Sequence, residues 1–283
     1  MSVLKDRTGQ YRYVAAVLQF LLAAFAAVQM FPLVWLVLSS FKNNLEITGA
    51  NVIGFPRQWR WDNYRYVLDA TRLGSNLLNS LLYSIATVVL SGILASMVSY
   101  AVTRMKWKGS GFVLALFMTG LMIPVHATLL PVFIMMKEAR LLNTPLALVI
   151  PYTVNALPST IFIMAGFFAS LPREMEESGV IDGCNIYAVF WHIILPLLKP
   201  AIVTTAVFTF LGAWNELMFA NTLVNKENLM TVTVAINSLR GIHFTEYGAI
   251  FAGLALATFP PVLVYALFSD QVQKSMIAGA IKG

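Results

Sequence analysis

The chain has 283 residues, of which 58% are hydrophobic and 11% are charged. Soluble domains carry about 25% charged residues, so this composition excludes an ordinary soluble domain and indicates a protein built for lipid. The net charge of +6 is spread between apolar blocks, which argues against a nucleic-acid-binding face and favours loops at an anionic membrane surface. Cys184 is the single cysteine, and no cysteine or histidine cluster has metal-ligand spacing, so we expect neither an internal disulfide nor a metal site.

Six stretches are long and apolar enough to form helices across a hydrocarbon core of about 30 Å. The first follows several basic residues, as in a signal peptide, but its apolar run is too long for one and predicts an uncleaved anchor. Small residues four apart, such as Ser91, Ala95 and Ser99, predict close helix contacts. The sequence therefore predicts an all-α integral membrane protein with six transmembrane helices. The stretches are residues 13–40, 77–103, 111–136, 146–169, 200–222 and 247–268.

The charges of the loops predict which side of the membrane each loop faces. An even number of spans places both termini on one side, and lysine and arginine are divided almost evenly between the two sides. The short basic loop 104–108 favours cytoplasmic termini. We therefore expect residues 1–12 to form a cytoplasmic N-terminus of a multi-pass protein of the plasma or inner membrane.

Residues 171–200 are too polar to cross a membrane and too apolar for a solvated linker. Pro172 and three glutamates soon after it predict a helix start, and Gly183 predicts a left-handed turn that ends this helix. A second short helix should follow until Pro196 breaks it. Exposed apolar side chains on such a helix-turn-helix indicate a protein partner. We expect this surface to include Val180, Ile181, Tyr187, Val189 and Phe190.

The same residues resemble the EAA loop of ABC importer membrane subunits, whose pattern is E-A-A-x3-G-x9-I-x-L-P. Here Ser178-Gly179 replaces the two alanines with small residues, although Gly179 weakens a helix by up to about 1 kcal/mol relative to alanine. Trp214-Asn215-Glu216 and the C-terminal end are similar to the carbohydrate-uptake branch, especially the shorter permease of maltose-type importers. The matching loop residues are Glu177, Ser178, Gly179, Asp182, Gly183, Ile193, Leu195 and Pro196.

The resemblance covers essentially the whole chain and implies the type I ABC importer permease (MetI-like) fold. It implies that residues 13–283 form one transmembrane domain, with a coupling loop at 171–200 and a C-terminal tail at 269–283. The function implied is a permease subunit of a binding-protein-dependent importer, forming half of the translocation pathway for a sugar, oligosaccharide or polysaccharide. Its implied partners are a second homologous permease, preferably as a heterodimer, two nucleotide-binding ATPase subunits and a solute-binding protein.

Energy must come from those partners, because the chain has no Gly-Lys pair and so no P-loop for ATP phosphates. We therefore expect no enzymatic activity and no cofactor in this chain, with ATP and magnesium used by the partner subunits. In this interpretation Glu177 and Asp182 make polar contacts where the loop docks, although Glu177 could instead be a solvated acid at a helix start. By resemblance, the C-terminal residues Gly279, Lys282 and Gly283 reach the nucleotide-binding subunits.

Polar side chains within spans are costly and are candidates for a solute pathway. Sugars need amide groups and aromatic faces, which favours Tyr152 with Asn155, and Trp214 with Asn215 and Glu216. The alternative is hydrogen bonding between helices. Other solutes, such as a glycerol derivative or a peptide, stay open. A secondary transporter is disfavoured because Glu216 is the only acidic residue in the predicted spans, and a membrane enzyme because no catalytic motif is present.

Overall fold

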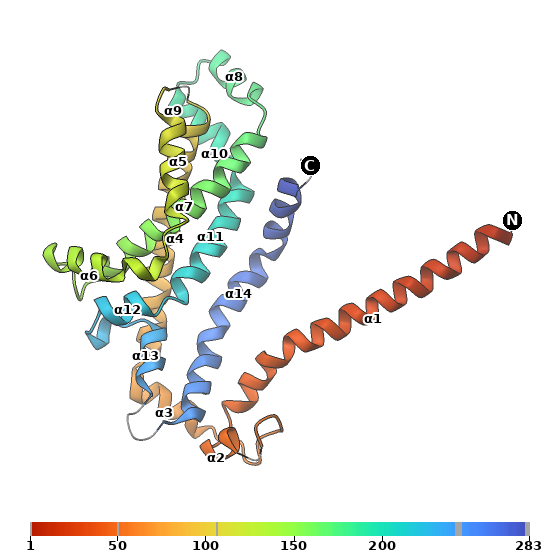
Figure 1. Ribbon diagram of the computed structural model, residues 1–283, viewed down its shortest axis with the longest axis vertical. Coiled ribbons are helices and arrows are strands. Elements are labelled where there is room, and N and C mark those ends of the chain that lie inside the picture. The colour runs from red at the N-terminus through yellow and green to blue at the C-terminus, as the bar shows by residue number, and fades with distance from the viewer. Residues whose placement is uncertain (1, 50, 106, 241–244, 281–283) are drawn as a thin grey trace. The chain divides into compact units, whose positions relative to one another are not determined.

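The computed structural model describes residues 2–49, 51–105, 107–240 and 245–280. Within these ranges the chain is helical, and the only β-type pairing is an isolated bridge between Arg240 and Thr245 (Figure 1). The all-helical prediction is therefore confirmed. The α-helices are α1 (Ser2–Ser39), α2 (Asn44–Thr48), α3 (Asp62–Thr71), α4 (Leu73–Thr103), α5 (Ser110–Gly120), α6 (Leu129–Glu138), α7 (Leu146–Ser170), α8 (Glu174–Ile181), α9 (Ile186–Ala188), α10 (Leu195–Leu197), α11 (Lys199–Trp214), α12 (Met218–Leu223), α13 (Val232–Ser238) and α14 (Tyr247–Ala280), with short 3₁₀ helices η1 (Val125–Thr128) and η3 (Glu227–Leu229) and a π-helix η2 (Val189–Ile194).

Four of the described helices are long and apolar enough to cross a membrane: Arg12–Ser39 of α1, the whole of α4 and α7, and Tyr247–Gln273 of α14. Two further pairs of helices pass the same test together but are bent. The pair Ser110–Gly120 and Val125–Glu138 meets at 94°, and the pair Ile186–Leu197 and Lys199–Trp214 meets at 72°. If each bent pair is one span, the total is six, as predicted.

Both bends occur at prolines. Pro124 has an extended backbone (φ −61°, ψ 117°) and cannot donate a helical hydrogen bond, so it separates α5 from η1. Pro196 lies within α10 and Pro200 in the first turn of α11, so the second bend falls after Leu197, and the prediction that Pro196 itself breaks the helix is wrong. The fifth predicted span, 200–222, differs from the structure because α11 ends at Trp214 and a separate helix, α12, begins at Met218.

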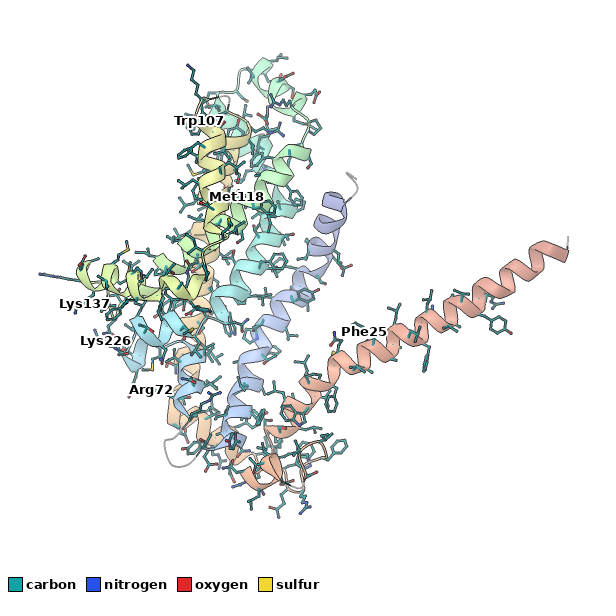
Figure 2. All side chains as sticks on the ribbon, in the orientation of Figure 1. Phe25, Arg72, Trp107, Met118, Lys137 and Lys226 are labelled. Atoms are coloured by element: carbon teal, nitrogen blue, oxygen red, sulfur yellow. The ribbon has the colours of Figure 1, made fainter. Side chains whose placement is uncertain are left out.

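The chain divides into two compact units, Met1–Ala70 with Leu239–Leu256 and Thr71–Ser238 with Ala257–Gly283. In the first unit, the side chains of α1 from residue 12 to residue 34 are exposed, and Figure 2 shows Phe25 projecting outward from this helix. A long apolar helix without protein cover suits contact with lipid.

A polar cluster organises the chain after α1 in the first unit. The Lys42 side chain is fully buried, and its ammonium group donates to the carbonyls of Asn51 (2.8 Å) and Val52 (2.9 Å). The Asn63 amide donates to the carbonyls of Ser40 (2.8 Å) and Lys42 (2.9 Å). Because buried polar groups must be paired, these bonds fix the path of the loop.

The Glu46 carboxylate belongs to the same loop and is 6% exposed. It accepts a hydrogen bond from the Arg57 backbone N–H (2.9 Å) and another from the Asn51 amide (2.9 Å). The Arg57 bond, with support from the Asn51 bond and the nearby positive charges, holds the pKa of Glu46 below its usual value, although burial acts in the opposite direction.

In the second unit α4 packs along α7 and α11 (Figure 1). Ser91, Ala95 and Ser99 on α4 are each 1% exposed or less, which confirms the predicted close helix contacts. Ala95 packs with Ile161 and Met164 of α7, and the Ser99 hydroxyl donates to the Ile161 carbonyl (3.3 Å). Small side chains thus bring these two helices together over their length.

The second unit carries different features at its two ends. Figure 2 shows Arg72, which precedes α4, at one end and Trp107, which follows α4, at the other. Helices α8 and α9 lie at the Trp107 end (Figure 1). Lys137 and Lys226, near the ends of α6 and α12, lie on one side of the unit, away from Trp107 (Figure 2). The predicted loop at 171–200 and the basic loop at 104–108 therefore share one end of this unit.

Candidate functional site

The helix-turn-helix predicted between the fourth and fifth spans is present. Its first helix, α8, has three glutamates in its first turn, where carboxylates interact favourably with the helix dipole. Gly183 follows α8 with φ +82°, so the predicted left-handed turn is confirmed. The Gly183 N–H donates to the Val180 carbonyl (3.0 Å) and the Cys184 N–H to the Gly179 carbonyl (2.9 Å). These two bonds make a Schellman motif, which satisfies carbonyls at the end of α8.

Gly179 lies where α8 packs against η2. A Cβ atom on Gly179 would lie 2.3 Å from Cδ1 of Ile193 and 3.3 Å from Cγ2 of Val189. Both distances are shorter than ordinary van der Waals contacts, so the absence of a side chain allows the two helical parts to approach closely. Ile193 therefore occupies the space that the alanine of the EAA pattern would need.

The second half of the segment changes its helical winding. Asn185 caps its start by accepting a hydrogen bond from the Ala188 N–H (2.8 Å). The helix then widens to a π-helix over η2, and the Leu195 N–H donates to the carbonyl of Phe190 five residues earlier. Such wide turns are rare and occur often at functional sites.

The inner face of η2 forms an aromatic core with α4 and α7. Val189 and Phe190 are 2% and 7% exposed, so the prediction that both lie on the docking surface is wrong. Phe190 packs on Tyr100 with ring centroids 5.2 Å apart, and Tyr100 packs on Phe168 at 5.9 Å. These contacts turn the large side chains of η2 inward. The other three predicted surface residues are exposed: Val180 (62%), Ile181 (84%) and Tyr187 (74%).

The remaining EAA-type residues are mostly on the outside of this segment. Glu177, Ser178 and Asp182 are exposed on or beside α8, and the Ser178 hydroxyl donates to a backbone carbonyl one turn earlier (3.0 Å). Leu195 is half-buried and Pro196 is exposed. The acidic side chains are therefore accessible to a partner, while Gly179 and Ile193 hold the two helices together.

Arg104 is a residue whose structural role the sequence did not reveal. Its Nε atom lies 3.2 Å from Oε1 of Glu176, and the two side chains are 5% and 19% exposed. Its Nη2 atom also donates to the carbonyls of Leu171 (2.7 Å) and Phe168 at the end of α7. No sequence signal distinguished Arg104 from the other basic residues of its loop.

A cavity of about 630 Å³ lies within the second unit, between α4, α7 and α11. Four of the five predicted pathway residues, Tyr152, Asn155, Asn215 and Glu216, line it together with His126. Its exposed wall is largely apolar, with hydroxyl and amide groups set into it. The other lining residues are Thr87, Val125, Ala156, Ser159, Thr160, Ile163, Thr205, Phe208, Thr209, Gly212, Ala213, Leu217 and Met218.

The Glu216 carboxylate is held by three hydrogen bonds. It accepts from the backbone N–H groups of Phe219 (2.8 Å) and Ala220 (3.0 Å) at the start of α12, and from the Tyr152 hydroxyl (2.8 Å). A carboxylate at a helix N-terminus is stabilised by the orphan N–H groups and by the helix dipole. Glu216 thus joins the α11–α12 break to α7 at the cavity wall.

Trp214, the fifth predicted residue, is not among the residues that line the cavity. It is 2% exposed, stacks on Phe210 and donates from its indole N–H to the Ala257 carbonyl (3.2 Å). The sequence also missed two lining residues with suitable chemistry. Phe208 is 53% exposed, and the fully buried Thr87 hydroxyl makes no hydrogen bond within the described part of the chain. The Phe208 ring is therefore open to a ligand, whereas the Thr87 hydroxyl lies behind the exposed surface of the wall.

The predicted tail contacts lie at the end of the described chain. The backbone at Gly279 belongs to α14, whereas Lys282 and Gly283 lie outside the described residues. Among the residues that the structure describes, no group of three His, Cys, Asp or Glu side chains could hold a metal ion.

Comparison with known proteins places these features in a family. The model of the family "binding-protein-dependent transport system inner membrane component" matches residues 88–278. The chain is 31% identical over 253 residues to the probable ABC transporter permease protein YurM of Bacillus subtilis, covering 89% of this chain and 84% of that one. It is 29% identical over 273 residues to the diacetylchitobiose uptake system permease protein NgcG of Streptomyces coelicolor, covering 96% and 90%.

A solved structure shares the fold. The crystal structure of a bacterial ABC transporter involved in the import of the acidic polysaccharide alginate contains a chain with a TM-score of 0.78 and 21% identity, covering 92% of this chain and 96% of that one. The type I importer permease architecture predicted from the sequence is thus confirmed. Since the family model covers well over half of the sequence, this chain belongs to the inner-membrane permease components of binding-protein-dependent ABC transport systems, which are transport subunits rather than enzymes.

Proposed function

We propose that this permease forms half of the pathway for a sugar or oligosaccharide in an ATP-driven importer. The observation that carries the proposal is the cavity of about 630 Å³, whose largely apolar wall carries a few hydroxyl and amide groups. Several relatives are named for saccharide uptake, among them the Streptomyces diacetylchitobiose permease and a trehalose permease of Mycobacterium tuberculosis. A few polar groups in an apolar wall are typical of a small-molecule site and suit a sugar, whose ring has both apolar faces and hydroxyl groups.

The cavity offers the contacts that a sugar needs. The Asn155 amide both donates and accepts hydrogen bonds, and the exposed ring of Phe208 offers an apolar face for a sugar ring. Glu216 is already held by α12 and Tyr152, so its role is to shape the wall.

Coupling to ATP is proposed to occur through α8 and its turn. The exposed apolar side chains of Val180, Ile181 and Tyr187 suit a cleft on a nucleotide-binding subunit, with Glu177 and Asp182 making polar contacts beside them. ATP and magnesium act in that subunit. Its closure moves α8, and the motion opens the cavity to one side of the membrane and then to the other.

The orientation follows from this coupling. α8 and the basic loop at 104–108 share one end of the second unit, so a cytosolic ATPase places both in the cytoplasm. Six spans then put both termini on the cytoplasmic side, with residues 1–12 as a short N-terminus and Gly279, Lys282 and Gly283 near the ATPase subunits. The pore is completed by a second, related permease, as a heterodimer, and a binding protein delivers the solute from outside.

Reconstitution into liposomes tests the coupling. The complete importer should transport sugar only with ATP, and Gly183→Pro should remove solute-stimulated ATP hydrolysis while the protein still inserts. Proline cannot adopt φ +82° and has no N–H for the Val180 carbonyl. Transport without any ATPase subunit would contradict the proposal and favour a secondary transporter.

Substitution of the cavity wall tests the solute. Asn155→Ala should lower the transport rate without lowering the thermal stability of the complex. Asn79→Ala is the matched control, because the Asn79 amide lies on α4 and donates to the carbonyls of Asn228 (2.9 Å) and Met230 (3.1 Å). That variant should lower stability instead. If a purified binding protein selects a glycerol derivative or a peptide from a panel of solutes, the sugar assignment is wrong.

A further inference from the structure

The helix α8 is separated from the cavity that it is proposed to move. No residue of α8 lines the cavity, whose wall comes largely from α4, α7 and α11. Movement of α8 can reach the solute through the short connection to α7, residues 171–173, and through contacts between α8 and its neighbours. The packing of Gly179 on Ile193 is one such contact and leads through η2 toward α11. The Arg104–Glu176 interaction is another, and it leads to α4 and α7.

The Arg104 guanidinium joins three parts of the chain at once. It follows the last residue of α4, contacts the Glu176 carboxylate on α8 and donates to the carbonyls of Phe168 and Leu171 at the end of α7. A guanidinium has five donors in a rigid planar fork, whereas the ammonium group of lysine is a compact point charge. Arg104 uses one end of this fork for hydrogen bonds to the two carbonyls, while its Nε atom pairs with the Glu176 carboxylate by charge alone, without a hydrogen bond between Nε and Oε1.

The position of this interaction makes it stronger than a surface ion pair. With side chains 5% and 19% exposed, Arg104 and Glu176 are shielded from water and salt. The Phe168 carbonyl already accepts a hydrogen bond from the Leu171 N–H (3.1 Å), and the guanidinium adds a positive charge at this negative end of the α7 dipole. Removing either partner leaves the other charge largely buried and unpaired, which breaks the link.

The helices that meet at Arg104 carry much of the cavity wall. Thr87 belongs to α4, while Tyr152, Asn155 and Ser159 belong to α7. We propose that Arg104 is a positioning residue that transmits the movement of α8 to α4 and α7, and through them to the solute cavity. This inference rests on the proposed function, since it assumes that α8 is moved by an ATPase subunit.

A cysteine reporter in the cavity tests the transmission in the complete importer. Cys184, the single native cysteine, is replaced by alanine, and Ser159→Cys places a thiol on the exposed, cavity-lining face of α7. The rate of its reaction with a small methanethiosulfonate reagent is measured without nucleotide and after trapping with magnesium, ATP and vanadate. With Arg104 present, trapping should change this rate by about fivefold or more. In the Arg104→Gln variant trapping should change the rate much less, because only the route through Gly179 and Ile193 keeps its contacts, although ATP hydrolysis continues.

Two further variants sharpen the test. Lys108→Gln removes a positive charge from the same loop, outside the interaction, and should behave like the unsubstituted protein. Glu176→Gln removes the carboxylate charge but leaves the bonds from Arg104 to α7. Nucleotide trapping should therefore change the reaction rate of the reporter thiol less than it does when Glu176 is present. If Arg104→Gln fails to assemble with the ATPase subunits, Glu176→Gln and Arg104→Lys decide the question by the same measurement.

The outcomes separate this inference from the proposed function. If nucleotide trapping changes the reaction rate of the reporter thiol equally in the Arg104 protein and in Arg104→Gln, Arg104 does not transmit the movement, although the proposed function stands. If trapping leaves the reaction rate of the reporter thiol unchanged when Arg104 is present, the proposed function is contradicted, because ATP then does not move this cavity. A fall of about fivefold in solute transported per ATP in Arg104→Gln, but not in Lys108→Gln, supports the inference independently.

Discussion

Replacement of Gly183 tests the turn that ends α8. At φ +82° an L-residue with a Cβ atom costs about 1–2 kcal/mol more than glycine. A Cβ atom here would meet no heavy atom within 4 Å, so the cost of Gly183→Ala comes from the backbone alone. Asparagine enters this conformation more easily than alanine, so Gly183→Asn should cost less.

This free-energy cost predicts how much more often the turn at Gly183 is frayed. A cost of 1–2 kcal/mol lowers the ratio of ordered to frayed turn by roughly 5- to 30-fold. Hydrogen exchange of the peptide that contains Gly183 and Cys184 should therefore accelerate in Gly183→Ala within the assembled importer, and less in Gly183→Asn. Solute-stimulated ATP hydrolysis should fall in the same order.

A second glycine supplies the matched control. Gly166 lies within α7, and a Cβ atom there also meets open space, but its φ is not in the left-handed region. Gly166→Ala should therefore stabilise its helix by up to about 1 kcal/mol. If the Gly183→Ala importer shows the same hydrogen exchange at this peptide and the same ATP hydrolysis as the unsubstituted importer, the turn does not position α8. That result would refute the role given to Gly183.

Three further predictions concern the contacts described above. Gly179→Ala should lower solute-stimulated ATP hydrolysis, because its Cβ atom would meet Cδ1 of Ile193. Adding Ile193→Val, which removes Cδ1, should restore the hydrolysis. A double variant that loses more activity than Gly179→Ala alone would contradict this reasoning. Glu216→Gln should cost about 1.5–3 kcal/mol, because it removes the charge and replaces one of the two acceptor oxygens that face α12 with an NH₂ group; the cost should appear as a lower melting temperature of the complex. Because the pKa of Glu46 is lowered in the folded state, its stabilisation is present at neutral pH and lost as the pH falls through that pKa, so Glu46→Gln should flatten the acid side of the stability profile.

Much of the fold follows from local chemistry in the sequence. Long apolar runs give the spans, because backbone groups in lipid must pair within a helix. The row Ser91, Ala95 and Ser99 identified the contact face of α4, and Gly183 identified a left-handed turn. Each of these signals depends on residues close together in the chain, so a single sequence is enough to detect it.

The features that the sequence did not reveal depend on contacts between distant residues. Phe190 is apolar at a helical position and could face outward, but Tyr100 and Phe168 bury it from helices far away in the chain. The end of α11 at Trp214 depends on Glu216 capping a new helix. Arg104 looked like any loop charge, because its partners lie more than sixty residues away.

Photocrosslinking from Ile181 tests most directly whether α8 is the site where an ATPase subunit acts. This side chain is 84% exposed at the end of α8, so a benzoylphenylalanine in its place leaves the fold intact. In the complete importer in native membranes, irradiation should join this position to the nucleotide-binding subunit, and nucleotide trapping should change the yield. A crosslink to the solute-binding protein, or to lipid alone, would show that α8 does not dock on the ATPase.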